Sequence, residues 1–128
     1  FNHPVKELVW AVQANGAKST VLAGSTDDIK LQLNGHDRFS ERKGDYFQLV
    51  QAYQHHTNIP TEPSKKVYAY SFALRPEEHQ PSGTCNFSRI DNATLNLTAS
   101  ANGSLWIFAH SYNVLRVMSG MGGLAYSN

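Results

Sequence analysis

The stretch VKELVWAVQ, residues 5–13, decides the fold class of this chain. β-Branched and aromatic residues dominate it, and they favour strands because they pack well on a pleated surface. Its apolar side chains fall on both faces of an extended strand, with Leu8, Trp10 and Val12 on one face and Val5, Val9 and Ala11 on the other. A run of this kind predicts a central β-strand that is covered on both faces.

Two further strands are predicted in the middle of the chain, after a loop at residues 14–28. Residues 29–34 alternate between apolar and polar side chains and end at Asn34-Gly35, which predicts a half-exposed strand closed by a turn. Residues 67–74 also alternate, and they predict a strand with an aromatic face made of Tyr68, Tyr70, Phe72 and Leu74.

A hairpin is predicted near the C-terminus, because the runs 94–99 and 105–109 flank Asn102-Gly103. Residues 75–91, between this hairpin and the aromatic strand, contain two prolines and no usable period, and we predict a long ordered loop there. The whole chain therefore contains five predicted strands.

One helix is predicted between Asp45 and Tyr53. Asp45 and Gln48 have the spacing of a capping box, and Asn58-Ile59-Pro60 ends the helix. Its apolar face, which we expect to lie across the sheets, is Phe47, Val50 and Tyr53. Five strands and one helix joined mostly by turns predict an all-β fold, an antiparallel sandwich or jelly roll.

Length and charge exclude several classes of protein. The 128 residues allow one domain, and 11 Lys and Arg against 10 Asp and Glu give a net charge of +1. Such a charge produces no field that would gather nucleic acid or anionic lipid, and no apolar run is long enough to span a membrane. Because the chain begins with Phe1 and not with methionine, we expect a piece of a longer product.

No catalytic, metal or cofactor site is predicted. His55 and His56 are adjacent, and neighbouring side chains diverge in both helices and strands, so a metal site there is not expected. Cys85 is the single cysteine, with no histidine placed by the sequence to activate it, and Gly120-Met121-Gly122-Gly123 lacks the lysine of a phosphate-binding loop. Asn-x-Ser/Thr sequons occur at Asn86, Asn92, Asn96 and Asn102, and of these Asn102, at the predicted turn tip, is the glycosylation candidate.

Four blocks of sequence resemble the major capsid proteins of nucleocytoplasmic large DNA viruses, of the iridovirus and phycodnavirus kind. They are Phe1 to Leu8 (FNHPVKEL), Leu33 to Phe39 with Tyr46-Phe47 and Gln51 to Thr57, Tyr70 to Leu74 with Pro81 to Asn92, and Tyr112 to Asn128. The resemblance implies the C-terminal part of the second roll of a double jelly roll, with the five strands corresponding to E to I and strands B to D absent. Residues 1–128 are then one capsid jelly-roll portion, incomplete alone.

The resemblance also implies a structural function and no enzyme. The implied subunit forms homotrimers with a pseudo-hexagonal outline, which tile an icosahedral capsid assembled in the cytoplasm of the infected host cell. Its implied partners are itself, neighbouring capsomers and minor capsid proteins, with no direct nucleic acid contact, no membrane insertion and no cofactor. The alternative function is a jelly-roll carbohydrate-binding module, in which exposed Trp and Tyr side chains stack on sugars.

The C-terminal segment needs a cover, because the last 37 residues contain a single charged side chain, Arg116. Residues 105–126 place apolar side chains on both faces of extended strands, so we expect both faces to be buried. We expect Arg116 to be paired, with Asp91 or with a carboxylate of a neighbouring subunit.

Overall fold

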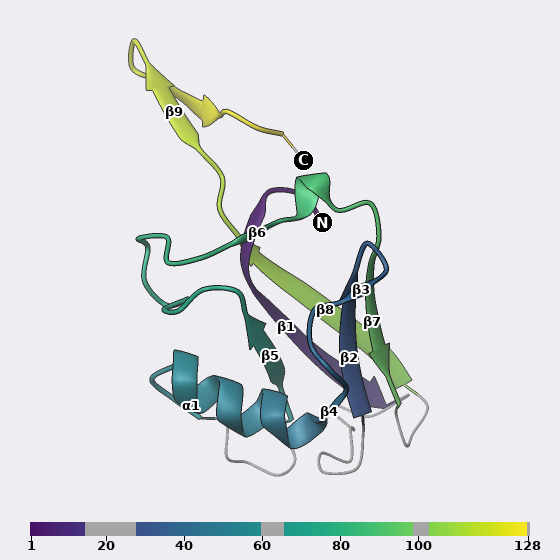
Figure 1. Ribbon diagram of the computed structural model, residues 1–128. Helices are drawn as coiled ribbons and strands as arrows, with labels where there is room; N and C mark the ends of the chain where they lie inside the picture. The colour runs from purple at the N-terminus through teal and green to yellow at the C-terminus, as the bar shows by residue number, and fades with distance from the viewer. Residues whose placement is uncertain (15–27, 60–65, 99–102, 128) are drawn as a thin grey trace.

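The computed structural model describes residues 1–14, 28–59, 66–98 and 103–127, and it consists of two facing antiparallel β-sheets, one short helical segment and a projecting hairpin (Figure 1). The first sheet is built around β1 (Pro4–Ala14). On one side β1 pairs with β8 (Gly103–Ser111), and on the other with β5 (Tyr68–Ser71) and β6 (Cys85–Asn86). The predicted central position of this strand is therefore confirmed. The predicted cover on both faces is not, because Val9 and Ala11 on its outer face are only half-buried.

The second sheet is built around β2 (Asp28–Leu33), which has the predicted half-exposed alternation. It pairs with β7 (Ala93–Leu97) on one side and with β3 (His36–Asp37) and β4 (Arg42–Lys43) on the other. The turn between β2 and β3 is the predicted one: Asn34 and Gly35 both have positive φ, 52° and 80°, as a tight hairpin turn requires.

The hairpin predicted from residues 94–99 and 105–109 is wrong. β7 belongs to the second sheet, where Leu31 lies opposite Leu95, and β8 belongs to the first, where Val9 lies opposite Phe108. The chain therefore changes sheets between these two strands, and Asn102 lies outside the described residues. A short connection with Asn-Gly fits either arrangement, because the turn signal is local and carries no information on which strand is the partner.

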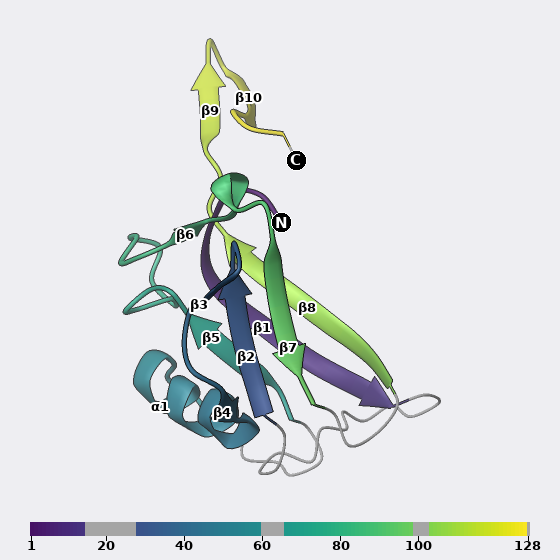
Figure 2. The ribbon, with the colours of Figure 1, turned by 45° about the vertical axis from the view of Figure 1, so that its right-hand side comes forward.

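The two sheets face each other across a shared core, with the β2–β7 pair in front of the β1–β8 pair in Figure 2. Trp10 stacks on Tyr68 with ring centroids 6.2 Å apart, and Ile29 and Leu31 face them from the second sheet. The aromatic face predicted for residues 67–74 is confirmed at Tyr68, which is buried, and at Tyr70 and Phe72, which pack against the core. It is wrong for Leu74, which is 73% exposed and lies beyond the end of β5 at Ser71. The core therefore draws on the inner faces of both sheets, as in a sandwich.

The predicted helix exists, but its buried face differs from the prediction. It begins with η1 (Tyr46–Val50), a π-type turn in which the N–H of Gln51 donates to the carbonyl of Tyr46, and continues as α1 (Gln51–His55). Asp45 makes no side-chain cap, so the capping box is not formed. Phe47 is fully buried, whereas Tyr53 is 78% exposed and Val50 is also exposed.

Two glutamines replace the expected apolar residues on the buried face of the helix. Gln48 and Gln51 are buried beside Phe47 and Ala52. The side-chain amide of Gln51 donates to Tyr46 Oη at 2.9 Å and accepts from the N–H of Ser71 at 3.2 Å. These two bonds offset the cost of burying the amide, and the bond with Ser71 ties the helix to β5. A prediction based on apolar spacing cannot find a face of this kind.

The interval 75–91, predicted to be a loop, contains β6 and a single 3₁₀ turn, η2 (Phe87–Arg89). Asn86 caps this turn, its Oδ1 accepting from the N–H of Ser88 at 3.1 Å. Phe87 is buried against the core, so even this irregular segment contributes to packing.

Gly83 is expected to tolerate no side chain. Its φ is +144°, a conformation that other residues rarely adopt, and a Cβ there would lie 2.5 Å from the carbonyl oxygen of Phe72. We expect Gly83→Ala to destabilise the complete subunit by about 2 kcal/mol or more in chemical denaturation, because both backbone segments have to move. Thr84→Ala, at the exposed position that follows Gly83, is the control; equal stability losses in the two variants would contradict the prediction.

Candidate interaction surfaces

The largest projection of the molecule is the hairpin of β9 (Leu115–Met118) and β10 (Met121–Leu124), which extends away from both sheets (Figures 1 and 2). Ser119 and Gly120 form its turn with φ of 51° and 75°. Two backbone contacts hold its base: the N–H of Tyr112 donates to Pro4 O, and that of Ala125 to Val114 O, both at 2.8 Å. The expectation that residues 105–126 are covered on both faces is therefore wrong for the hairpin within this chain.

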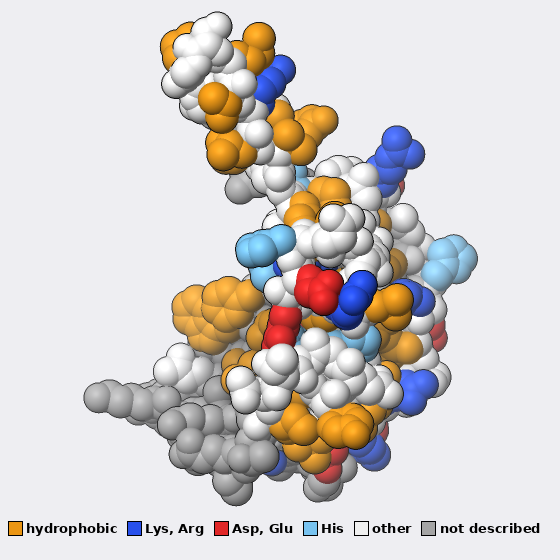
Figure 3. Space-filling model, turned by 90° about the vertical axis from the view of Figure 1, so that its left-hand side faces the viewer, with side chains coloured by type: hydrophobic (Ala, Val, Ile, Leu, Met, Phe, Trp, Pro, Cys, Tyr) orange, Lys and Arg blue, Asp and Glu red, His pale blue; other side chains and the backbone are white. Residues whose placement is uncertain are grey.

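Apolar side chains occupy both faces of this hairpin, at the top of the view in Figure 3. Leu115 lies opposite Leu124 and Val117 opposite Gly122 on one face, and Met118 lies opposite Met121 on the other. Each of these large side chains is more than half exposed. An isolated two-stranded hairpin is at best marginally stable in water, so this one has the properties of an arm that packs on another surface.

Arg116 is the charged residue of the hairpin. It is exposed and forms no ion pair with any residue that the structure describes, and Asp91 instead lines a cavity between the sheets. The expected pairing of Arg116 with Asp91 is therefore wrong. The reason is that the hairpin leaves the body of the molecule, which the alternation of its residues does not reveal.

A second exposed apolar strip lies on the outer face of the first sheet. Trp106 and Phe108 on β8 are both more than half exposed, and the residues opposite them on β1 are Ala11 and Val9. The alternate residue Ile107 points toward the core. This strip and the hairpin are two surfaces on which large apolar side chains gather.

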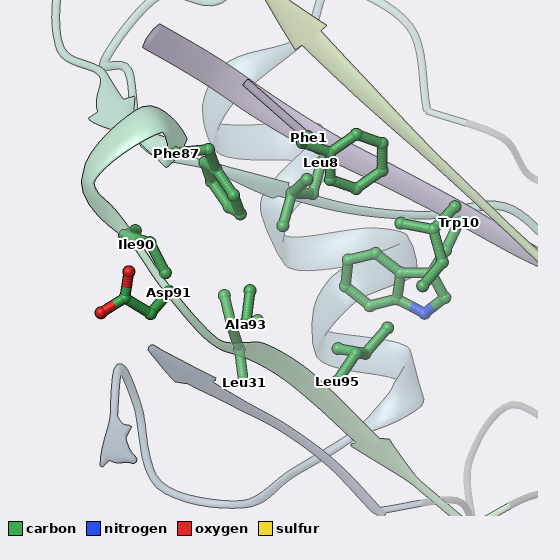
Figure 4. A pocket seen from close by; sticks show the side chains of 10 residues that line it. Phe1, Leu8, Trp10, Leu31, Phe87, Ile90, Asp91, Ala93 and Leu95 are labelled. Atoms are coloured by element: carbon green, nitrogen blue, oxygen red, sulfur yellow. The ribbon is translucent and has the colours of Figure 1, made fainter. Parts of the chain in front are cut away.

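A cavity of about 260 Å³ opens between the two sheets (Figure 4). Its lining is mostly apolar and comes from both sheets, from η2 and from the first residue of the chain; it consists of Phe1, Leu8, Trp10, Leu31, Phe87, Ile90, Asp91, Ala93, Leu95 and Ile107. The indole N–H of Trp10 is buried and meets no hydrogen-bond acceptor among the described residues. Protein cores are normally close-packed, so we expect side chains from outside the described part of the chain to fill this cavity.

A β-bulge in β1 gathers charged side chains on the outer face of the first sheet. The register with β8 shifts between Val5 and Glu7, and the carbonyl of the intervening Lys6 accepts from the N–H groups of Phe72 and Ala73. The side chains of Lys6 and Glu7 are both buried, although they lie in an otherwise apolar strand. Lys6 Nζ donates to Glu78 O at 3.4 Å and lies 5.0 Å from the centre of the Tyr112 ring.

Glu7 meets His56 at the C-terminal end of α1. His56 Nε2 contacts Glu7 Oε1, and its Nδ1 lies 3.1 Å from Oε1 of Glu77; we call this group the Glu7–His56–Glu77 bridge. The side chain of Glu7 is 5% exposed. Figure 3 shows histidine, acidic and basic side chains gathered on this face, between the hairpin and the helix.

The remaining residues singled out in the sequence lie apart from one another. His55 Nδ1 lies 3.0 Å from the carbonyl oxygen of Leu74. Cys85 is half-buried in β6, and burial raises the pKa of its thiol against the opposing charge of Arg38, so the nucleophilic thiolate is disfavoured. Among the described residues no three or more His, Cys, Asp or Glu are arranged to hold a metal ion, and no helix has the length and apolarity to cross a bilayer.

The sequence and the structure of the chain were compared with those of known proteins. The sequence profile described as "Large eukaryotic DNA virus major capsid protein" matches residues 1–123. The chain belongs to this family. It is 54% identical over 149 aligned positions to the major capsid protein of Pyramimonas orientalis virus, an alignment that covers all of this chain and 38% of that protein. It is 41% identical to the major capsid protein of Paramecium bursaria Chlorella virus 1, covering all of this chain and 42% of the relative.

Solved structures of capsid proteins have the same fold. The chain superposes on PBCV-1 VP54, a crystal structure fitted into a reconstruction of the virophage Sputnik, with a TM-score of 0.83 and 39% identity, covering all of this chain and 44% of that one. The Faustovirus major capsid protein, at 12% identity, shares the fold with a TM-score of 0.63 over 87% of this chain and 30% of that one. The predicted fold class, an antiparallel jelly-roll sandwich with one short helix, is confirmed. The chain spans less than half the length of these relatives.

Proposed function

We propose that residues 1–128 are the C-terminal part of the second jelly roll of a major capsid subunit, and that the subunit builds the shell of a large icosahedral virus. The family match over residues 1–123 carries this proposal. The proposed unit of assembly is a homotrimer of pseudo-hexagonal outline, which contacts neighbouring capsomers and minor capsid proteins in the virion. Assembly takes place in the host cytoplasm, and the subunit has no enzymatic activity.

The exposed apolar surfaces support an assembly role. The chain leaves Trp106, Phe108 and large apolar side chains on both faces of the β9–β10 hairpin exposed, which is typical of surfaces that pack on another protein surface. The open cavity between the sheets and the indole N–H of Trp10, which is buried with no acceptor among the described residues, support a further point: the roll is completed by strands from the rest of the subunit.

The experiment compares residues 1–128 with the complete subunit, expressed side by side and sized by light scattering. The complete subunit is expected to have the mass of three chains, and residues 1–128 alone are expected to aggregate or to melt without cooperativity, because their sheet edges and apolar surfaces stay open. A monomeric complete subunit would contradict the trimer. A soluble, cooperatively melting monomer of residues 1–128 would contradict the incomplete roll.

The same two samples test the alternative, a carbohydrate-binding module. Trp106 is exposed and able to stack on a sugar, whereas Tyr68 is buried and not available for stacking. Glycan binding that is lost in Trp106→Ala, together with a monomeric complete subunit, would favour the module over the capsid role.

A further inference from the structure

The Glu7–His56–Glu77 bridge joins three segments that are distant in the sequence: β1, the end of α1, and the connection between β5 and β6. Both ring nitrogens of His56 face a carboxylate oxygen. A neutral imidazole has one N–H and donates one hydrogen bond, whereas the imidazolium has two and donates both. The bridge is therefore complete in one protonation state of His56, the cation.

The segment held by this bridge is the 75–79 tip, the part of the β5–β6 connection that follows Leu74. Residues on either side of the tip are fixed by backbone bonds, Ala73 N–H to Lys6 O and Leu74 N–H to Ser82 O. The tip itself is fastened by Glu77, which contacts His56 and also accepts from the N–H of Thr57, and by the burial of Pro76. Two further contacts hold it: the N–H of Arg75 donates to Ser82 Oγ at 2.9 Å, and Lys6 Nζ donates to Glu78 O.

We propose that the Glu7–His56–Glu77 bridge is a pH-sensitive clasp, which holds the 75–79 tip on the first sheet while His56 is protonated and releases it when His56 loses its proton. This inference concerns a conformational device of the subunit and goes beyond its role in a shell. It requires no ligand and no partner.

The charges around His56 favour its cationic form. Burial alone would lower the pKa of His56, but its hydrogen bonds with Glu7 and Glu77 and the charges of both carboxylates outweigh burial and raise it. Glu77 is itself ionised, because the N–H of Thr57 donates to its Oε1 at 3.0 Å and, with the hydroxyl of Thr57 and with His56, lowers its pKa. Two negative charges therefore face one ring.

Other titratable and charged groups near the bridge do not replace His56. From β1, Lys6 faces the tip, and from β8, His110 lies opposite Glu7. Burial and the charge of Lys6 lower the pKa of His110, so that His110 loses its proton at a lower pH than His56 does. Within the tip Arg75 Nε lies 3.4 Å from Glu78 Oε2. On the helix the ring of His55 contacts a backbone carbonyl and no carboxylate of a described residue.

The sign of the pH effect follows from the raised pKa. A histidine whose pKa is higher in the folded state contributes its full stabilisation below the pKa of the unfolded chain, and this stabilisation is lost as the pH rises through the folded value. The clasp is thus closed in mildly acidic solution and opens as the pH rises.

The test is hydrogen–deuterium exchange of the complete subunit over a pH series, with amide rates corrected for their intrinsic pH dependence. Loss of a partly buried, charge-assisted bond is expected to make exchange of the 75–79 tip about tenfold faster on the alkaline side of the transition. In His56→Gln the tip is expected to exchange rapidly at every pH. His79→Gln, which changes a histidine within the tip that forms no ion pair with a described residue, is expected to keep the wild-type response.

A second measurement does not depend on any variant. Exchange of the ring C2 proton of His56 in the wild-type subunit reports its pKa directly, and this pKa is expected to lie above that of the unfolded chain. A pKa at or below the unfolded value overturns the proposal. So does a tip whose corrected exchange is independent of pH, or one whose pH response persists in His56→Gln.

Discussion

Replacement of Phe47 by alanine is expected to destabilise the complete subunit by about 3–5 kcal/mol, the range found when a fully buried aromatic ring is removed from a core. The ring of Phe47 is fully buried, and its centroid lies 5.3 Å from that of Trp10, 5.2 Å from Phe39 and 5.1 Å from Tyr46. No neighbour can fill the space without leaving its own ring contacts, so a cavity remains and adds to the cost.

Tyr53→Ala is the matched control for this prediction. It removes an aromatic ring from the same helix, but this ring is 78% exposed, and we expect a change within about 0.5 kcal/mol. The measurement is chemical denaturation of both variants in the complete subunit. Similar losses of stability in the two variants, or a loss below about 0.5 kcal/mol for Phe47→Ala, would place Phe47 outside the core.

Deletion of residues 112–128 from the complete subunit is expected to abolish assembly. The deletion removes the β9–β10 hairpin, whose Leu115, Val117 and Leu124 form an exposed apolar face with no cover among the described residues. If this hairpin packs on another part of the subunit or on a neighbouring copy, its loss leaves that surface open as well. Sizing is expected to find monomers or insoluble protein, and normal trimers would rule out the role of the hairpin.

The deletion also removes Tyr112, which contacts Lys6 and Pro4 in the body, so a point variant is needed beside it. Leu115→Asp combined with Leu124→Asp places two charges on one face of the hairpin, at positions that lie directly opposite each other. The control is Thr94→Asp, an exposed polar position on β7. Assembly lost in the double variant and kept in the control assigns the defect to the hairpin face; equal behaviour of the two contradicts it.

The sequence predicted those strands that a local apolar pattern is enough to identify. Residues 5–13 are apolar on both parities, and β1 does lie between β8 and β5. A local pattern does not predict which strand pairs with which, because pairing depends on residues that are distant in the sequence. The pattern around Asn102-Gly103 therefore predicted two strands correctly and joined them wrongly.

The Glu7–His56–Glu77 bridge shows which signal the sequence analysis overlooked. The sequence pattern around His56 shows only its neighbour His55, whereas the partners of His56 are 49 and 21 residues away. One local sign was present: Lys6 and Glu7 interrupt a strand that is otherwise apolar. Two charges in a strand predicted to be covered on both faces require ionic or polar partners, and this would have directed attention to the histidines.

The pairing of β1 with β8 joins residues from near the two ends of the described body, and this has a consequence for synthesis on the ribosome. At about 5–20 residues per second, β1 leaves the ribosome roughly 5–20 seconds before β8 follows it. During that interval the most apolar strand of the sheet has no partner on one edge, and such high contact order also makes closure slow. We therefore expect the nascent chain to engage chaperones until β8 has been released from the ribosome.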